Sequence, residues 1–190
     1  VLLLLASPVF AENLYFGQSA AGSNDGSSCA NQLSAAAFNT AGNWGVGAGK
    51  ISAGDTAHLC GTITTPLVYQ ASGTVGNIIT VVFETGAAFT HPTFCTTAGC
   101  INMDSKSYVT LDGGTACGYI ARVDTGCNGK ISNTTAQPNA SSYAVSANGC
   151  ANCEIKNLEI GPIYRQTGGG TYNGVGNYRG IQNVAGGTPA

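Results

Sequence analysis

The chain has 190 residues, of which 43% are hydrophobic and only 8% are charged, with a formal net charge of −2. This composition excludes a disordered chain, and the lack of a basic cluster argues against a nucleic-acid partner. The length allows one domain with a sizeable core, and no apolar run beyond the first eleven residues is long enough to cross a membrane.

Residues 1–11 predict the end of a secretory signal peptide. The apolar run Val1–Leu5 is broken by residues 6–8, and residues 9–11 place a β-branched and a small residue at the two positions that a signal peptidase reads. A run of about ten residues is too short to span a bilayer, which needs about twenty. We expect the first residues of the leader to be missing, cleavage after Ala11, and a secreted or cell-surface location in an oxidising compartment.

The segment ENLYFGQ, residues 12–18, resembles a viral protease site that is used to remove tags, but Gly17 and Gln18 are swapped. That protease needs Gln directly after Phe, so a tag with this order would be useless. An engineered linker and a native segment both remain open, and the native one is favoured. Residues 14–16 then predict a short apolar and aromatic strand.

One helix is expected, over the Ala-rich residues 29–39. Ser27 or Ser28 would be its N-cap, and Leu33, Ala36 and Ala37 would share one face. We expect residues 12–49 to form an N-terminal strand and a helical cap that covers a β-rich core, with the only tryptophan beside it.

Eight cysteines together with a leader predict disulfides rather than free thiols. Pairing neighbours gives Cys29–Cys60, Cys95–Cys100, Cys117–Cys127 and Cys150–Cys153. A zinc site or a redox CxxC at residues 150–153 is the alternative, but the sequence offers no second matching pair for zinc and no βαβ pattern for a redox motif.

Strands separated by turn residues are expected from residue 50 onward. The candidates are residues 56–60, 78–83, 100–103, 108–111, 119–123, 143–146 and 154–160. Residues 101–113 resemble residues 144–157, and a third copy begins at residues 180–184, which gives a repeat of about 40 residues.

Each copy is a strand, a polar turn and a second strand that ends at a residue tolerant of positive φ, Gly113 or Asn157. Within residues 154–160, three apolar side chains are expected to point inward and three charged ones outward, and this alternation breaks at Asn157, where the chain should bend. One such unit cannot bury its apolar face alone, so stacked coils of a parallel solenoid are expected. An antiparallel β-sandwich is the alternative, but hairpin signals are scarce.

Several of these segments resemble secreted proteins of the pectin-lyase-like superfamily. They are the leader, the aromatic start at Tyr15, the capping segment 29–44, residues 54–56, and the units 107–114 and 153–160. The resemblance implies an all-β fold, a right-handed parallel β-helix (solenoid) with a short N-terminal capping helix. Residues 50–190 would be its first coils, truncated at the C-terminus, and the full-length protein would be a monomer.

The resemblance also implies two kinds of function. Many members are polysaccharide lyases or hydrolases, and others are adhesins or surface proteins. The first hypothesis is therefore a protein that binds or cleaves an extracellular polysaccharide, with calcium as a cofactor only if it is a lyase. The alternative is a non-enzymatic adhesin or a structural spacer.

Charged residues that could bind sugar are few, and no catalytic residue can be assigned. If the coils stack in register, Asp112 and Lys156 occupy equivalent positions, and Glu154 and Glu159 are expected to point outward on the same coil as Lys156. A surface ion pair that contributes little to stability is the plainer interpretation of these charges. No calcium-binding signature is present, and no other metal site is expected.

Aromatic and histidine residues complete the candidates. Tyr172 and Tyr178 lie in a Gly-rich stretch and could stack on sugar rings, or they could be ordinary loop anchors. We expect His58 to be a satisfied or solvent-facing strand residue and His91 to be a loop residue, both without a catalytic role.

Overall fold

The computed structural model describes residues 11–93, 95, 98–115, 129–135, 142–161 and 178–182, which form mainly short strands in three parallel sheets. In order across the first sheet lie β12 (Glu154–Lys156), β9 (Val109–Asp112), β6 (Ile79–Phe83), β3 (Thr56–Leu59), β1 (Asn13–Gly17) and β2 (Leu33–Ser34). The second contains β13 (Glu159–Ile160), β10 (Lys130–Asn133), β7 (Ala88–His91) and β4 (Thr62–Ile63). The third contains β14 (Tyr178–Gln182), β11 (Ser142–Ser146), β8 (Ile101–Asn102) and β5 (Leu67–Val68).

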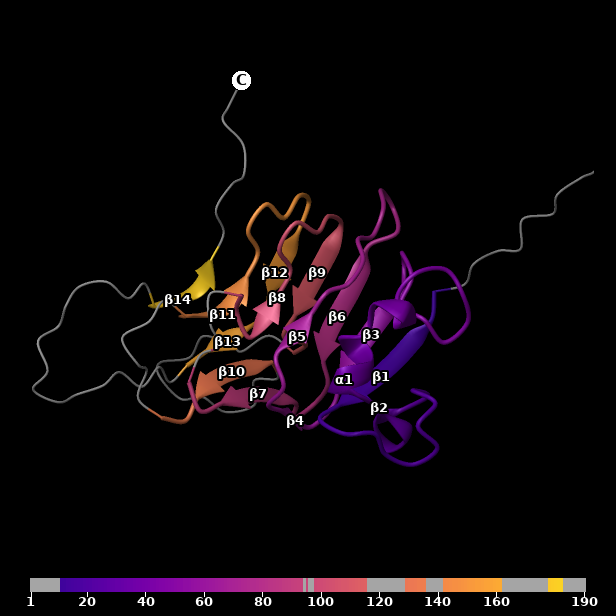
Figure 1. The fold of residues 1–190 in the computed structure, drawn as a ribbon, viewed down its shortest axis with the longest axis horizontal. Coiled ribbons are helices and arrows are strands. Elements are labelled where there is room, and N and C mark those ends of the chain that lie inside the picture. Colours follow the sequence, from indigo (N-terminus) through magenta and orange to yellow (C-terminus); the bar gives the residue numbers. More distant parts are fainter. Residues whose placement is uncertain are drawn as a thin grey trace, which may run out of the picture.

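From β3 onward the chain visits the three sheets in rotation. β3, β4 and β5 lie in the first, second and third sheets, and β6 then returns to the first sheet beside β3 (Figure 1). Every pairing between these named strands is parallel. The described strands therefore do not form the antiparallel sandwich that was the alternative, because that fold requires hairpin pairs.

One core lies between the sheets, and it is built from inward columns of apolar side chains in register. The columns are Leu14, Ala57, Val81, Leu111 and Ile155 in the first sheet; Ile63, Phe89, Ile131 and Ile160 in the second; and Leu67, Ile101, Val145 and Ile181 in the third. Alternate residues point outward, as the two-residue period of a strand requires. Burial is complete in the middle of each column and falls at Ile155, Ile160 and Ile181, on the last strands described.

The segment ENLYFGQ is an integral part of the fold. Strand β1 lies between β2 and β3, with Leu14 and Phe16 buried. The Gln18 side-chain oxygen accepts hydrogen bonds from the backbone N–H groups of Thr64 and Thr65 at 2.7 and 3.1 Å. A strand in the interior of a sheet is what a native segment provides, and the apolar strand expected at residues 14–16 is confirmed.

The helix expected over residues 29–39 is wrong in extent. A 3-10 turn at Cys29–Asn31 is followed by β2, and only α1 (Ala35–Phe38) is α-helical. Parallel pairing of Leu33 with Phe16 overrides the helix propensity of the alanines. The N-cap is consequently Ser34, whose hydroxyl accepts from the Ala37 N–H, and the buried face carries Ala35 and Phe38.

The N-terminal segment supplies hydrogen-bond partners for β5, the strand at one edge of the third sheet. The Asn39 side chain accepts from the Val68 N–H at 2.8 Å and donates to the Pro66 carbonyl at 2.7 Å. Helix α1 contacts both β1 and β5. An amide side chain thus takes the place of a neighbouring strand for β5, which would otherwise present unpaired backbone groups.

Three of the four expected disulfides are formed: Cys29–Cys60, Cys95–Cys100 and Cys150–Cys153. The first joins the 3-10 turn of the N-terminal segment to the residue directly after β3. Cys150 and Cys153 are bonded to each other, so they are not zinc ligands. The pair expected between residues 117 and 127 lies outside the described residues.

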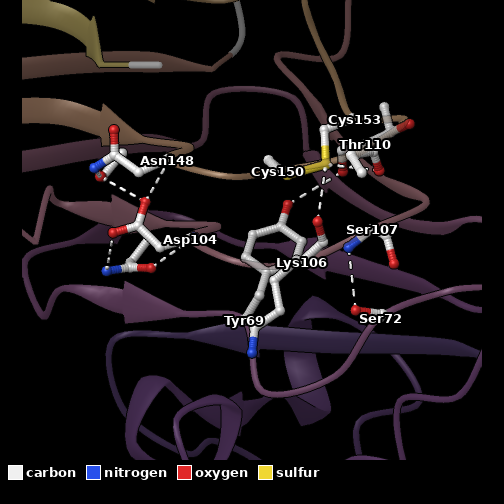
Figure 2. Close-up of a disulfide and its surroundings, with 12 residues drawn as sticks. Tyr69, Ser72, Asp104, Lys106, Ser107, Thr110, Asn148, Cys150 and Cys153 are labelled. Atoms are coloured by element: carbon white, nitrogen blue, oxygen red, sulfur yellow. Dashed lines mark hydrogen bonds between the residues drawn. A yellow bond between two sulfur atoms is a disulfide. The ribbon is translucent and has the colours of Figure 1, made fainter. Parts of the chain in front are cut away.

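The turns between the third and first sheets are held by polar contacts from one turn to the next (Figure 2). The buried Tyr69 hydroxyl donates to the Thr110 carbonyl at 3.1 Å, and burial raises the pKa of this phenol. Nearby, Asp104 accepts from the Ser146 hydroxyl and the Asn148 N–H, both at 2.7 Å. These contacts explain Asp104 as a structural residue, because each links a turn to its neighbour.

Gly113 and Asn157 occupy the expected corner, but for different reasons. Asn157 has φ +53°, as expected for a bend, whereas Gly113 is not in the left-handed region. Gly113 instead allows close approach, since a Cβ there would lie 1.7 Å from the Asn157 carbonyl oxygen. Gly113 thus does not use its tolerance of positive φ, and the requirement for glycine comes from the neighbouring backbone.

Replacing Gly113 by alanine is expected to destabilise the protein by about 2 kcal/mol or more, because backbone atoms of the adjacent turn must move. Urea unfolding followed by circular dichroism measures this. Gly42→Ala is the control, since a Cβ at Gly42 meets nothing within 4 Å and its φ is not left-handed. It should shift the free energy of unfolding by less than about 0.5 kcal/mol. Equal effects of the two substitutions would contradict the close-approach explanation.

Candidate functional site

The outward face of the first sheet carries the most varied chemistry in the described part of the chain. One outward column runs across five strands through Tyr15, His58, Val82, Asp112 and Lys156, each directly opposite the next. These strands lie side by side in Figure 1. Parallel register therefore places an aromatic ring, an imidazole, a carboxylate and an ammonium group in one row.

Lys156 lies between two carboxylates at one end of this row. Its Nζ is 2.9 Å from Glu154 Oε2 and 3.8 Å from Asp112 Oδ2. Asp112 also accepts from the Asn157 side chain and the Gly114 N–H, both at 2.9 Å. The carboxylate is thus held in place, while the side chains of Lys156 and Glu154 are 42% and 56% exposed and can reach a ligand.

The protonation state of Lys156 follows from these neighbours. The hydrogen bond to Glu154 raises the pKa of the ammonium group, and the negative charges of Glu154 and Asp112 act in the same direction. Lys156 is therefore a cation at neutral pH. It can donate hydrogen bonds to a ligand but cannot accept a proton there.

His58 lies at the other end of the row and is fully engaged. Its Nδ1 is 2.5 Å from Glu84 Oε1, its Nε2 is 3.0 Å from Asn13 Oδ1, and its ring stacks on Tyr15 with centroids 4.4 Å apart. The side chain is only 16% exposed. This is the satisfied strand histidine that the sequence favoured, and it holds the Tyr15 ring on the outward face.

The structure brings together three of the six predicted site residues, Asp112, Glu154 and Lys156. Glu159 lies elsewhere, because the corner at Asn157 carries the chain into the second sheet, where Glu159 pairs with Lys130 at 2.7 Å. Tyr172 lies outside the described residues. Tyr178 begins β14 in the third sheet, and only its backbone is described.

Sequence analysis missed part of this face. The sequence pattern does not indicate Asn13 or Glu84 as part of it, and it indicates Tyr15 only as part of an aromatic strand at the start of the fold. Extending the register of β9 and β12 back to β3 and β1 identifies Tyr15 as part of this face, because Tyr15 lies opposite His58. His91 ends β7 instead of lying in a loop, and its Nδ1 donates to the Thr93 carbonyl.

Among the described residues, no group of three His, Cys, Asp or Glu side chains is arranged to hold a metal ion. Within that same part of the chain, none of the helices is long and apolar enough to span a membrane. No protein-family model matches the chain, and no curated protein and no solved structure matches it significantly. The function of the protein is therefore inferred from its structure, above all from the geometry of the first sheet.

Proposed function

We propose that this is a secreted right-handed parallel β-helix protein that binds an extracellular polysaccharide along the outward face of its first sheet. The rotation of the chain through three parallel sheets supports the solenoid, because each circuit stacks on the previous one in register. Three disulfides suit an oxidising environment outside the cell. The N-terminal segment, with β1, β2 and α1, would serve as the cap of the first coil.

The observation that carries the binding proposal is the outward column from Tyr15 to Lys156. Neighbouring strands are about 4.8 Å apart, so the column extends over about 20 Å. A row of this length suits a polymer better than a single small molecule. The Tyr15 ring offers an apolar surface for a sugar ring, and the Asp112, Glu154 and Lys156 groups offer hydrogen bonds to hydroxyls.

The chemistry favours binding over cleavage. A lyase of this kind needs a basic side chain that accepts a proton from the substrate, and the raised pKa of Lys156 keeps that side chain charged. The imidazole of His58 has a partner on each ring nitrogen. The described part of this face thus resembles a recognition surface more than a catalytic centre.

A non-enzymatic spacer is the second candidate, and one observation favours it. Charged side chains on the outward faces are paired: Lys156 forms an ion pair with Glu154 and Lys130 with Glu159, and the His58 imidazole contacts Glu84. Charged groups that are already paired in this way do not require a ligand.

Binding of the secreted protein to immobilised neutral and uronate polysaccharides tests the proposal. Lys156→Ala should weaken binding about tenfold, because it removes a charged hydrogen-bond donor from the row. Lys130→Ala is the matched control, since Lys130 is also paired with a glutamate but lies in the second sheet. Product analysis in the same assay reports any cleavage. Equal losses from both substitutions would refute the location, and no binding to any polymer would favour the spacer.

A further inference from the structure

Asp55 is a carboxylate buried to 2% exposure directly before β3. Its Oδ1 accepts from the Glu12 backbone nitrogen at 2.7 Å, and its Oδ2 accepts from the Ser52 N–H at 2.6 Å. Among the described residues, no cationic side chain forms an ion pair with it. A buried carboxylate usually has a charged partner or a full set of hydrogen bonds, so this one has capacity for a cation.

Glu12 is fixed at three points. Besides the contact of its nitrogen with Asp55, its carbonyl accepts from the Thr56 N–H at 2.9 Å and its Oε2 accepts from the Gly49 N–H at 3.0 Å. Ala11, one residue earlier, is exposed. Parallel pairing with β3 then starts at Asn13, so the contacts that hold the N-terminal strand begin at Glu12.

We propose that Asp55 is the binding site for the α-ammonium group that is created when a signal peptidase hydrolyses the Ala11–Glu12 bond. Water adds across this peptide bond, Ala11 leaves with the leader as a carboxylate, and the Glu12 nitrogen becomes an ammonium group. That nitrogen already lies within hydrogen-bond distance of Asp55 Oδ1. Cleavage thus converts a hydrogen bond from a neutral amide to the carboxylate into one between an ammonium group and the carboxylate, at the start of β1. This inference is independent of any polysaccharide ligand.

The charges around the new terminus set its pH behaviour. An α-amino group ordinarily has a pKa of about 7.7–8.0, and an adjacent carboxylate raises it. The titratable groups on adjoining residues are the Glu12 carboxylate, which is bonded to the Gly49 N–H, Lys50 next to that glycine in the sequence, and His58 on β3, which contacts Asn13 and Glu84. A raised pKa means that the stabilisation is complete below the pKa of the unfolded chain and is lost as pH rises through the folded pKa.

The first test is the intact mass of the secreted protein, expressed with its leader. The expected product begins at Glu12. A chain that begins at any other residue overturns the proposal, because its terminal ammonium group would not lie at Asp55.

The second test compares two chains, one beginning at Glu12 and one retaining Ala11, each with and without Asp55→Asn. At pH 6, Asp55→Asn should accelerate unfolding at least about tenfold more in the chain that begins at Glu12. Equal acceleration in both chains overturns the ion pair. If the Asp55→Asn protein does not fold, the pH dependence of acylation of the α-amino group in the unsubstituted protein provides the test. Its midpoint should lie about one pH unit above that of the urea-unfolded chain, and identical midpoints overturn the proposal.

Discussion

Replacing Phe38 by alanine is expected to lower the free energy of unfolding by about 3–5 kcal/mol, the largest effect of a single substitution that we predict. Phe38 is fully buried on α1 and makes edge-on contacts with Phe16, Trp44 and Tyr69 at centroid distances of 5.0–6.0 Å. Removing the ring leaves a cavity where the N-terminal segment meets β1 and β5. Urea unfolding followed by circular dichroism measures the change.

Val46→Ala is the control for this experiment, because Val46 is 89% exposed and should change stability by less than about 0.5 kcal/mol. Trp44 is the only tryptophan and packs on Phe38, so its fluorescence reports the same region in the unsubstituted protein. A loss of less than 1 kcal/mol in Phe38→Ala would mean that α1 is not part of the cooperative core.

Replacing both Cys29 and Cys60 by serine is expected to destabilise the protein by about 4 kcal/mol. This disulfide closes a loop with a sequence separation of 31 residues, and the chain-entropy model assigns about 3.7 kcal/mol to a loop of that size. Without it, the 3-10 turn at Cys29–Asn31 is no longer tied to the end of β3. Thermal unfolding of the oxidised proteins measures the loss.

The matched control is the double replacement of Cys150 and Cys153 by serine. The separation there is 3 residues, so the same model gives only about 1.6 kcal/mol. Similar losses in the two double variants would show that native-state contacts, and not loop entropy, determine the contribution of these disulfides.

Some of the longer strands could be predicted because their apolar residues alternate clearly, but β7 and β10, with four residues each, match no expected segment. Strands β3, β6 and β11 match the expected segments to within one residue at each end. Strands β4 and β5 have two residues each, and a run of that length has no detectable period. Their place is decided by pairing with β7 and β8, which only the three-dimensional stack reveals.

The sequence predicts the repeat only for its last interval, between β9 and β12. Equivalent outward positions on β3, β6, β9 and β12 are 58, 82, 112 and 156, so the interval lengthens from 24 to 30 to 44 residues. A repeat of about 40 residues describes the last interval but not the earlier ones. The third copy expected at residues 180–184 is confirmed in part, since β14 pairs with β11.

The same irregularity explains the outcome for the candidate site. Asp112 and Lys156 could be placed opposite each other because they occupy one position of the regular repeat. Adding Tyr15 to the row of Asp112 and Lys156 requires the two shorter intervals of 24 and 30 residues between β3 and β9, which the sequence does not reveal. The expected bend at Asn157 is confirmed, and because it starts a new strand in the second sheet, Glu159 does not join the row of Asp112 and Lys156.

The corner between the first and second sheets has a consequence for how such a protein can change. At this corner, residues 60–61 follow β3 and residues 84–87 follow β6, whereas β9 ends at Asp112 and β10 begins only at Lys130. The strands on both sides keep their register. Insertions at this corner are therefore compatible with the scaffold. Segments grafted there would alter the border of the Tyr15–Lys156 row and leave the core columns unchanged, which makes the corner a natural position for diversifying or engineering specificity.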